Sequence, residues 1–146
     1  MAHLFDTNTF LRLAEKHTKH RPIVVDAIRN LRNENEAIFY SPQVLMEFWN
    51  VCTRPSDARG GLGLSVEQTE RKAELIQKYF TLLHDSAAVF TAWRRLVSDF
   101  QVKGVQVHDA RLVATMIAYN IPYLVTFNVK DFQRFPMITV INPSDL

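Results

Sequence analysis

The sequence predicts an α/β protein in which helices cover both faces of a parallel sheet. Two observations lead to this prediction. Short apolar runs alternate along the chain with longer segments whose apolar residues recur with helical spacing, and this alternation is typical of strand–helix–strand units with parallel strands. The 146 residues contain no repeat, low-complexity tract or linker-like stretch, so we expect one domain over residues 1–146.

Five apolar runs are the expected strands. Each run is short and is bounded by polar or turn-forming residues, as the strands of a buried sheet usually are. The runs cover residues 2–5, 37–40, 81–84, 122–126 and 138–141. None approaches the 18 or so consecutive apolar residues of a transmembrane helix, so no membrane segment is expected.

Helices are expected between these runs, and capping signals mark where several of them start. Ser41 followed by proline indicates an N-cap serine with proline in the first turn. Ser65 and Gln68 form a candidate capping box, and Ser86 is a further candidate N-cap. A proline and three glycines predict a loop over residues 55–63. The expected helices cover residues 8–19, 22–35, 42 to just before 55, about 66–79, 86–102 and 108–120.

Composition and charge limit the class of protein. The single cysteine, Cys52, excludes an internal disulfide framework and fits a reducing cytoplasm. No basic segment followed by a long apolar stretch opens the chain, so no signal peptide is expected. The net charge of +2 is weak, but basic residues outnumber acidic ones within residues 11–32. That segment either attracts phosphates or forms a solvated helix surface, and the sequence leaves both readings open.

Polar residues follow the predicted strands at places where a ligand site would form. Asp6 follows the first strand, Glu47 lies in the helix after the second, Asp109 opens a helix, and Asn128 and Asp131 follow the fourth strand. The carboxyl ends of parallel strands meet at one edge of a sheet. Oxygen ligands gathered there would suit Mg²⁺ or Mn²⁺. The competing readings are a first-turn helix acid for Asp109 and a solvent-facing helix residue for Glu47.

Several stretches resemble those of the PIN-domain ribonucleases and, within them, the VapC-type toxins. The matching stretches are FDTN at residues 5–8, LMEFWNVCTRP at 45–55, GGLGLS at 60–65, VHDARLVATM at 107–116 and LVTFNVKDFQRF at 124–135. The resemblance spans nearly the whole chain in the same order. It implies a three-layer α/β/α sandwich with about five parallel strands, a divalent metal in an acidic pocket, and endonucleolytic hydrolysis of RNA phosphodiester bonds.

The resemblance assigns roles to the acidic residues. Asp6, Glu47 and Asp109 match the first three acids of the family, which implies that they bind Mg²⁺ or Mn²⁺ and take part in catalysis. Many relatives place a fourth aspartate where this chain has Asn128. Asp131, three residues later, is the alternative source of that charge. Either residue is therefore a candidate ligand, and we expect Asp131 to share the catalytic role.

Neighbouring polar residues are expected to support this site. Thr7, Asn8 and Thr126 would hold the carboxylates or contact phosphate, and Arg111 is a candidate phosphate contact. For Thr7 and Asn8 the competing reading is helix capping, and for Arg111 it is exposed surface charge. His108 fits a helix start better than an acid–base role, because metal-assisted hydrolysis does not need a histidine.

The resemblance also implies partners. They are an RNA substrate, a cognate antitoxin protein and a second copy of the chain. No membrane partner is expected. A PIN-like module that binds RNA or an antitoxin without cutting is the second hypothesis, and Asn128 is its best support. A third, a magnesium-binding receiver-like domain, ranks low because no lysine follows the last strand.

Overall fold

The computed structural model describes all 146 residues of the chain and contains five strands and seven α-helices. In chain order, the elements are β1 (Ala2–Phe5), α1 (Thr7–Ala14), α2 (His20–Asn33), β2 (Ala37–Tyr40), α3 (Pro42–Thr53), α4 (Val66–Tyr79), β3 (Thr81–Leu82), α5 (Ala87–Asp99), α6 (Val107–Tyr119), β4 (Tyr123–Val125), α7 (Val129–Phe132) and β5 (Thr139–Ile141). Short 3₁₀ turns at Gly104–Gln106 and Pro143–Asp145 complete the chain. None of the helices has both the length and the apolar composition needed to cross a membrane.

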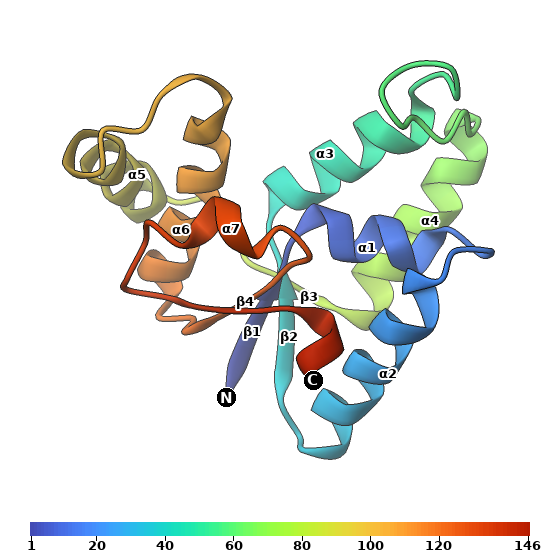
Figure 1. Ribbon diagram of the computed structural model, residues 1–146, viewed down its shortest axis with the longest axis horizontal. Helices are drawn as coiled ribbons and strands as arrows, with labels where there is room; N and C mark the ends of the chain where they lie inside the picture. The colour runs from blue at the N-terminus through green and yellow to red at the C-terminus, as the bar shows by residue number, and fades with distance from the viewer.

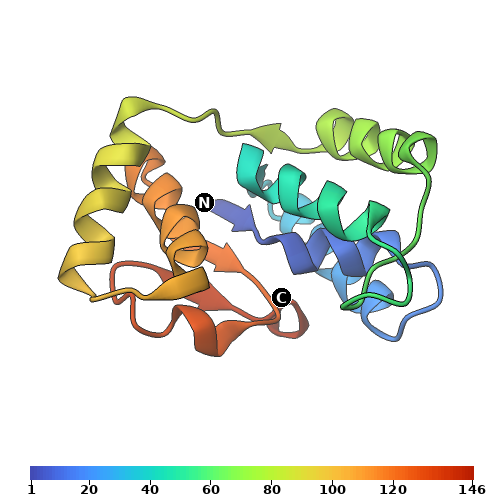
Figure 2. The same cartoon turned by 90° about the horizontal axis from the view of Figure 1, so that it is seen from above.

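The strands form one parallel sheet in the order β3-β2-β1-β4-β5. In Figures 1 and 2, α1 to α4 lie on one side of the sheet and α5 to α7 on the other, so the molecule has three layers. The chain runs outward from β1 through β2 to β3, and then returns to β4 and β5 on the other side of β1. This reversal creates a switch point between β1 and β4, where ligands of open parallel sheets usually bind.

The core fills the space between the sheet and both helix layers. Leu4 and Phe5 of β1, and Leu124 and Val125 of β4, are completely buried. Because consecutive residues of a strand point to opposite faces, these two central strands are covered on both sides. The predicted α/β/α architecture with five parallel strands is therefore confirmed.

The predicted capping signals do start helices. The Ser41 side chain accepts a hydrogen bond from the Val44 amide at the start of α3. Ser65 and Gln68 form the complete capping box of α4, and Ser86 caps α5 by accepting from Val89. Each side-chain oxygen satisfies an amide that has no partner within the helix.

The helix predicted over residues 8–19 is wrong in its extent. It begins at Thr7 and ends at Ala14, because the next residue, Glu15, turns into an extended conformation. Basic side chains from other helices then bind the last carbonyls of α1: Arg21 donates to Leu13 (3.0 Å) and Lys72 to Ala14 (3.4 Å). These cations also interact favourably with the negative end of the helix dipole.

Other parts of the prediction also differ from the structure, including the helix predicted over residues 22–35, which covers His20–Asn33. The third strand covers only Thr81–Leu82 instead of residues 81–84. The helix predicted to reach residue 102 ends at Asp99, and Gln101 then adopts a left-handed conformation with φ of 48°. The short helix α7 was not predicted, because its four residues carry no periodic apolar pattern.

Candidate metal site

The candidate site lies at the switch point, where the carboxyl ends of β1 and β4 meet. Asp6 directly follows β1, and its backbone amide donates to the Val125 carbonyl at the end of β4 (3.0 Å). Thr126 follows β4 and is completely buried beside it. Backbone pairing in the sheet therefore holds the first acidic residue against the neighbouring strand, independently of its side-chain contacts.

Asp6 is only 9% exposed, and its carboxylate accepts hydrogen bonds from three donors. One oxygen accepts from the Thr7 amide (2.7 Å), and the other accepts from the Thr126 hydroxyl (2.7 Å) and the Asn8 amide group (3.1 Å). The Asn8 amide group also donates to Thr126 (2.9 Å), and its oxygen accepts from the Phe127 amide (3.1 Å). Asp6 itself is the N-cap of α1, so the capping reading of Thr7 and Asn8 is wrong. These residues hold the carboxylate instead.

Glu47 projects from α3 and is bound through both carboxylate oxygens. The Thr7 hydroxyl donates to Oε2 (2.7 Å) and the Gln43 amide group donates to Oε1 (2.9 Å). The side chain is half-buried, so the reading of Glu47 as a freely solvated helix residue is wrong. Thr7 therefore joins the two acidic residues, because its amide contacts Asp6 and its hydroxyl contacts Glu47.

Asp109 and Asp131 complete the acidic cluster. Asp109 is half-buried in the first turn of α6, and its carboxylate receives no hydrogen bond from the protein. Asp131 is exposed in α7 and lies close enough to Asp109 to affect its ionisation. Asn128 is exposed at the start of α7, where its side chain makes no capping hydrogen bond and its backbone amide donates to Thr126 (3.0 Å). The fourth negative charge of the cluster therefore comes from Asp131 and not from position 128.

Burial and the neighbouring carboxylates both raise the pKa values of Asp6 and Asp109. Burial raises the pKa of Asp6 to about 6, the hydrogen bonds from Thr126 and Thr7 oppose that rise, and the charges of Glu47 and Asp109 add to it. Burial also raises the pKa of Asp109 to about 6, followed by the charges of Asp131 and Glu47, while Arg134 lowers it. Such a group of acids retains its protons more readily than exposed acids do, unless a cation neutralises it.

The donor set suits a hard divalent cation that keeps much of its water. All four acidic side chains offer oxygen, which Mg²⁺ and Mn²⁺ prefer. No three Asp, Glu, His or Cys side chains of the chain lie close enough together, as placed, to ligate one ion directly. Magnesium is commonly bound through one or two carboxylates, with waters filling the other positions, so the arrangement fits that ion.

Arg111 lies apart from the acidic cluster, and His108 lies at the helix start, as expected. The Arg111 guanidinium forms an ion pair with Asp85 (2.8 Å) and contacts none of the four acids. His108 is exposed, and its backbone carbonyl accepts a hydrogen bond from the Gln43 side chain (2.8 Å). Gln43 was not among the predicted site residues. Its position one helical turn before Glu47 is the only sequence signal that indicates the contact.

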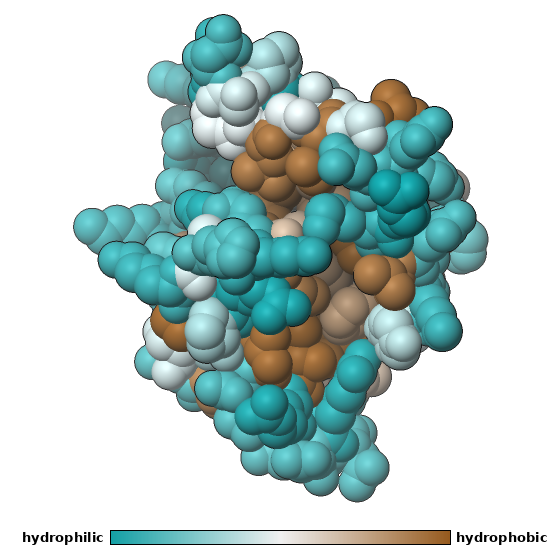
Figure 3. Space-filling model, turned by 90° about the vertical axis from the view of Figure 1, so that its right-hand side faces the viewer, coloured by the Kyte–Doolittle hydropathy of each residue, from teal (hydrophilic) through white to brown (hydrophobic).

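A second feature is an apolar groove that is separate from the acidic cluster. It has a volume of about 410 Å³ and lies between α1, α2 and α4. Figure 3 views this side of the molecule and shows apolar surface running between hydrophilic margins. The groove is lined by Phe10, Leu13, Ala14, Lys16, Arg21, Val25, Ile28, Arg32, Phe48, Lys72, Leu75, Ile76, Tyr79 and Phe80.

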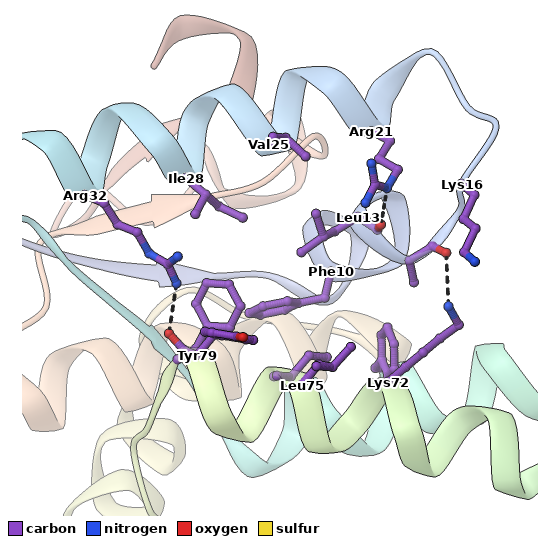
Figure 4. A pocket seen from close by; sticks show the side chains of 14 residues that line it. Phe10, Leu13, Lys16, Arg21, Val25, Ile28, Arg32, Lys72, Leu75 and Tyr79 are labelled. Carbon is purple, nitrogen blue, oxygen red and sulfur yellow. Dashed lines mark hydrogen bonds between the residues drawn. The ribbon is translucent and has the colours of Figure 1, made fainter.

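The edges of this groove are basic. Figure 4 shows Lys16, Arg21, Arg32 and Lys72 around an apolar floor. Three of them bind backbone carbonyls, including Arg32, which donates to Tyr79 (3.1 Å). No acidic side chain lines the groove. Its chemistry therefore favours an apolar partner that carries negative charge.

The fold and the site together define an α/β/α protein with a carboxylate cluster at the switch point of its parallel sheet. The sequence profile of the PIN domain matches residues 4–136. The chain belongs to the PIN-domain family, which confirms the family resemblance at that level.

Individual relatives are more distant. Ribonuclease VapC of Rickettsia bellii is 33% identical over 70 residues, which are 47% of this chain and 52% of that protein. The match thus spans about half the length of that relative. The Rickettsia felis VapBC2 structure bound to a promoter DNA fragment has a TM-score of 0.74 at 22% identity, covering 97% of this chain and 98% of that one. A toxin–antitoxin complex from Klebsiella pneumoniae has a TM-score of 0.64 at 23% identity, covering 96% of both chains. Both structures are similar to this chain in fold.

Proposed function

We propose that this protein is a metal-dependent endoribonuclease that hydrolyses RNA phosphodiester bonds. The observation that carries the proposal is the convergence of Asp6, Glu47, Asp109 and Asp131, from four different segments, at the switch point of the sheet. A stability role does not explain such a cluster, because buried like charges cost free energy. The Rickettsia bellii relative bears the name of a ribonuclease, which supports the same chemistry.

Mg²⁺ or Mn²⁺ is the proposed cofactor. A bound divalent ion would lower the pKa of a water and polarise a phosphate oxygen. Asp6 and Asp109 are the proposed direct ligands, since Asp6 is held firmly and the Asp109 carboxylate is free of hydrogen bonds. Glu47, fixed by Thr7 and Gln43, would orient a metal-bound water, and Asp131 would contribute charge at the open side of the site.

The alternative hypothesis is a module that binds RNA or an antitoxin without cutting RNA. It depends on Asn128, which stands where many relatives have a fourth aspartate. Asn128 is exposed and makes no side-chain hydrogen bond in the site. The charge of Asp131 acts on Asp109 in its place, so the cluster keeps four carboxylates. This arrangement favours the cutting enzyme.

We further propose that the enzyme is the toxin of a toxin–antitoxin pair and that the antitoxin occupies the apolar groove. The similar Klebsiella pneumoniae structure is described as a toxin–antitoxin complex. The groove is open, with Leu75 and Tyr79 each 54% exposed, and cations border it. It would bind a helical segment with an apolar face flanked by acidic residues. The RNA substrate and this antitoxin would meet the enzyme in the cytoplasm.

A homodimer is the proposed assembly. Met46 on α3 and Phe90 on α5 are 63% and 65% exposed. Contiguous exposed apolar surface often marks an interface, and Met46 lies in one such hollow with Leu45 and Trp49. Light scattering after gel filtration measures the mass directly. We expect two copies for the natural chain and one for Met46→Glu combined with Phe90→Glu.

The proposed activity is tested with chain purified free of any antitoxin. Structured RNAs are incubated with Mg²⁺ or Mn²⁺, and the fragments are separated by gel. We expect cleavage that a chelator abolishes and that Asp6→Asn or Asp109→Asn reduces by a factor of about 100 or more. Asp99→Asn is the control, because Asp99 is an exposed acid at the end of α5 outside the cluster. Cleavage that survives chelation, or that survives both substitutions, would refute the proposal.

A further inference from the structure

We propose that Gln43 is a positioning residue that sets the distance between Glu47 and Asp109 in the acidic cluster. The proposal rests on the proposed nuclease function of that cluster and adds to it a residue that bears no charge. Gln43 lies on α3, one turn before Glu47, and is only 7% exposed. It contacts both the glutamate side chain and the segment that carries Asp109.

The Gln43 amide group donates two hydrogen bonds. Its nitrogen donates to Glu47 Oε1 (2.9 Å) and to the His108 carbonyl (2.8 Å). An amide nitrogen has two hydrogens, so both are used. Because both partners are acceptors, the amide has only one satisfactory orientation.

The two hydrogen-bond partners of Gln43 lie in opposite helix layers. Glu47 is on α3, in the helix layer formed by α1 to α4, whereas His108 lies in the first turn of α6, in the opposite layer (Figure 1). No other hydrogen bond joins α3 to α6. His108 immediately precedes Asp109, so Gln43 fixes the backbone next to an acid whose own carboxylate has no hydrogen bond.

Gln43 ends a series of hydrogen bonds that begins at Asp6. Thr7 Oγ1 donates to the second oxygen of Glu47 (2.7 Å), and the Thr7 amide donates to Asp6 (2.7 Å). A continuous set of hydrogen bonds therefore runs from Asp6 through Thr7, Glu47 and Gln43 to the backbone beside Asp109. Gln43 is the last link, and only this link reaches the segment that carries Asp109.

An amide side chain at position 43 costs folding free energy. The Gln43 Oε1 atom is buried and has no hydrogen-bond partner, which disfavours the folded state. Methionine or leucine would fill the same volume without an unpaired acceptor. A residue needed only for packing would not require the amide, so its two donated hydrogen bonds explain its presence.

The test is Gln43→Met, which keeps the side-chain length and removes both donors. The control is Thr115→Val, which removes a different buried hydrogen bond, to the Arg111 carbonyl within α6 (3.2 Å), at a site without acids. Three quantities are measured on each purified chain: the Mn²⁺ dissociation constant by calorimetry, kcat and KM for RNA, and the melting temperature without metal. Gln43→Leu repeats the test should methionine pack poorly.

We expect Gln43→Met to weaken Mn²⁺ binding by about tenfold or more and to lower kcat with little change in KM, as loss of a residue that orients metal ligands does. Thr115→Val should lower the melting temperature without changing either the Mn²⁺ affinity or kcat. If the natural chain binds Mn²⁺ and cuts RNA, yet both Gln43 variants stay within twofold of it, the positioning role is overturned and the nuclease function stands. If the natural chain neither binds Mn²⁺ nor cuts, the nuclease function fails and the role of Gln43 fails with it.

Discussion

At the residue scale, one carboxylate performs two tasks. Asp6 caps α1 and also lies at the centre of the acidic cluster. The sequence alone allowed Asp6, Glu47 and Asp109 to be selected, because Asp6 follows a predicted strand, Glu47 lies in the helix after the next strand, and Asp109 begins a helix. It did not reveal Gln43, since its partner, the His108 carbonyl, is 65 residues away in the chain. Contacts to a distant backbone carbonyl leave no local pattern.

Substituting Asp109 should stabilise the metal-free protein. Its pKa is about 6 in the folded chain, against 3.8 for an ordinary aspartate, so between these values the folded state binds more protons than the unfolded state. The free energy of unfolding therefore falls as pH rises through this window, and the full penalty is present above it. Asp109→Asn should thus raise the unfolding free energy at pH 7.5 by on the order of 1 kcal/mol.

Thermal melts at pH 4 and pH 7.5, in the presence of a chelator, measure this difference. The gain from Asp109→Asn should be smaller at pH 4, where the natural carboxyl is mostly protonated. Added Mg²⁺ should raise the melting temperature of the natural chain and leave that of the variant unchanged. A variant that melts below the natural chain at pH 7.5 without metal would contradict the burial and charge repulsion assigned to Asp109.

At the scale of elements, helix starts that depend on side-chain caps could be predicted, whereas helix ends that depend on tertiary contacts could not. Ser41, Ser65 and Ser86 start helices through bonds to amides three residues away, and such bonds appear as sequence patterns. The end of α1 depends instead on Arg21 and Lys72 binding its last carbonyls. Lys72 comes from α4, 58 residues from Ala14, so no local pattern could have placed that end.

The loop between α3 and α4 contains a glycine that allows close backbone contact. A Cβ atom on Gly61 would lie 2.4 Å from the Pro55 carbonyl oxygen and 2.5 Å from that of Arg54. Gly61→Ala must therefore shift the backbone, and we expect it to lower the unfolding free energy by about 2–3 kcal/mol, measured by urea denaturation. Gly60→Ala is the matched control. It has a left-handed φ of 71° but no atom within 4 Å, so its cost should be about 1 kcal/mol. Equal losses would show that the contact is not the cause.

At the scale of the whole molecule, the acidic site and the apolar groove occupy different surfaces. The acids lie at the switch point between β1 and β4, and the groove lies between α1, α2 and α4 (Figure 4). The five-stranded parallel architecture was predictable because alternation of strands and helices constrains the topology. The groove was not predictable, because it depends on how three amphipathic helices pack and on which of their apolar residues stay uncovered.

This separation predicts that antitoxin binding and cleavage respond to different substitutions. Leu75→Asp places a charge in the groove, so it should weaken the complex with the cognate antitoxin by tenfold or more in a calorimetric titration. Cleavage by the antitoxin-free chain should not change. Gln77→Asp is the control, because it makes the same charge on an exposed position of α4 outside the groove. An unchanged affinity for Leu75→Asp would show that the antitoxin binds elsewhere.

If the carboxylate cluster supports metal-assisted hydrolysis, water attacks the phosphorus of the RNA backbone. Mass spectrometry of RNA fragments made in ¹⁸O-labelled water tests this attack. We expect fragments that carry a phosphate monoester with one solvent-derived oxygen, formed only with Mg²⁺ or Mn²⁺ and absent with Asp109→Asn. Fragments that end in a 2′,3′-cyclic phosphate would instead show attack by the neighbouring RNA hydroxyl and would refute hydrolysis by water.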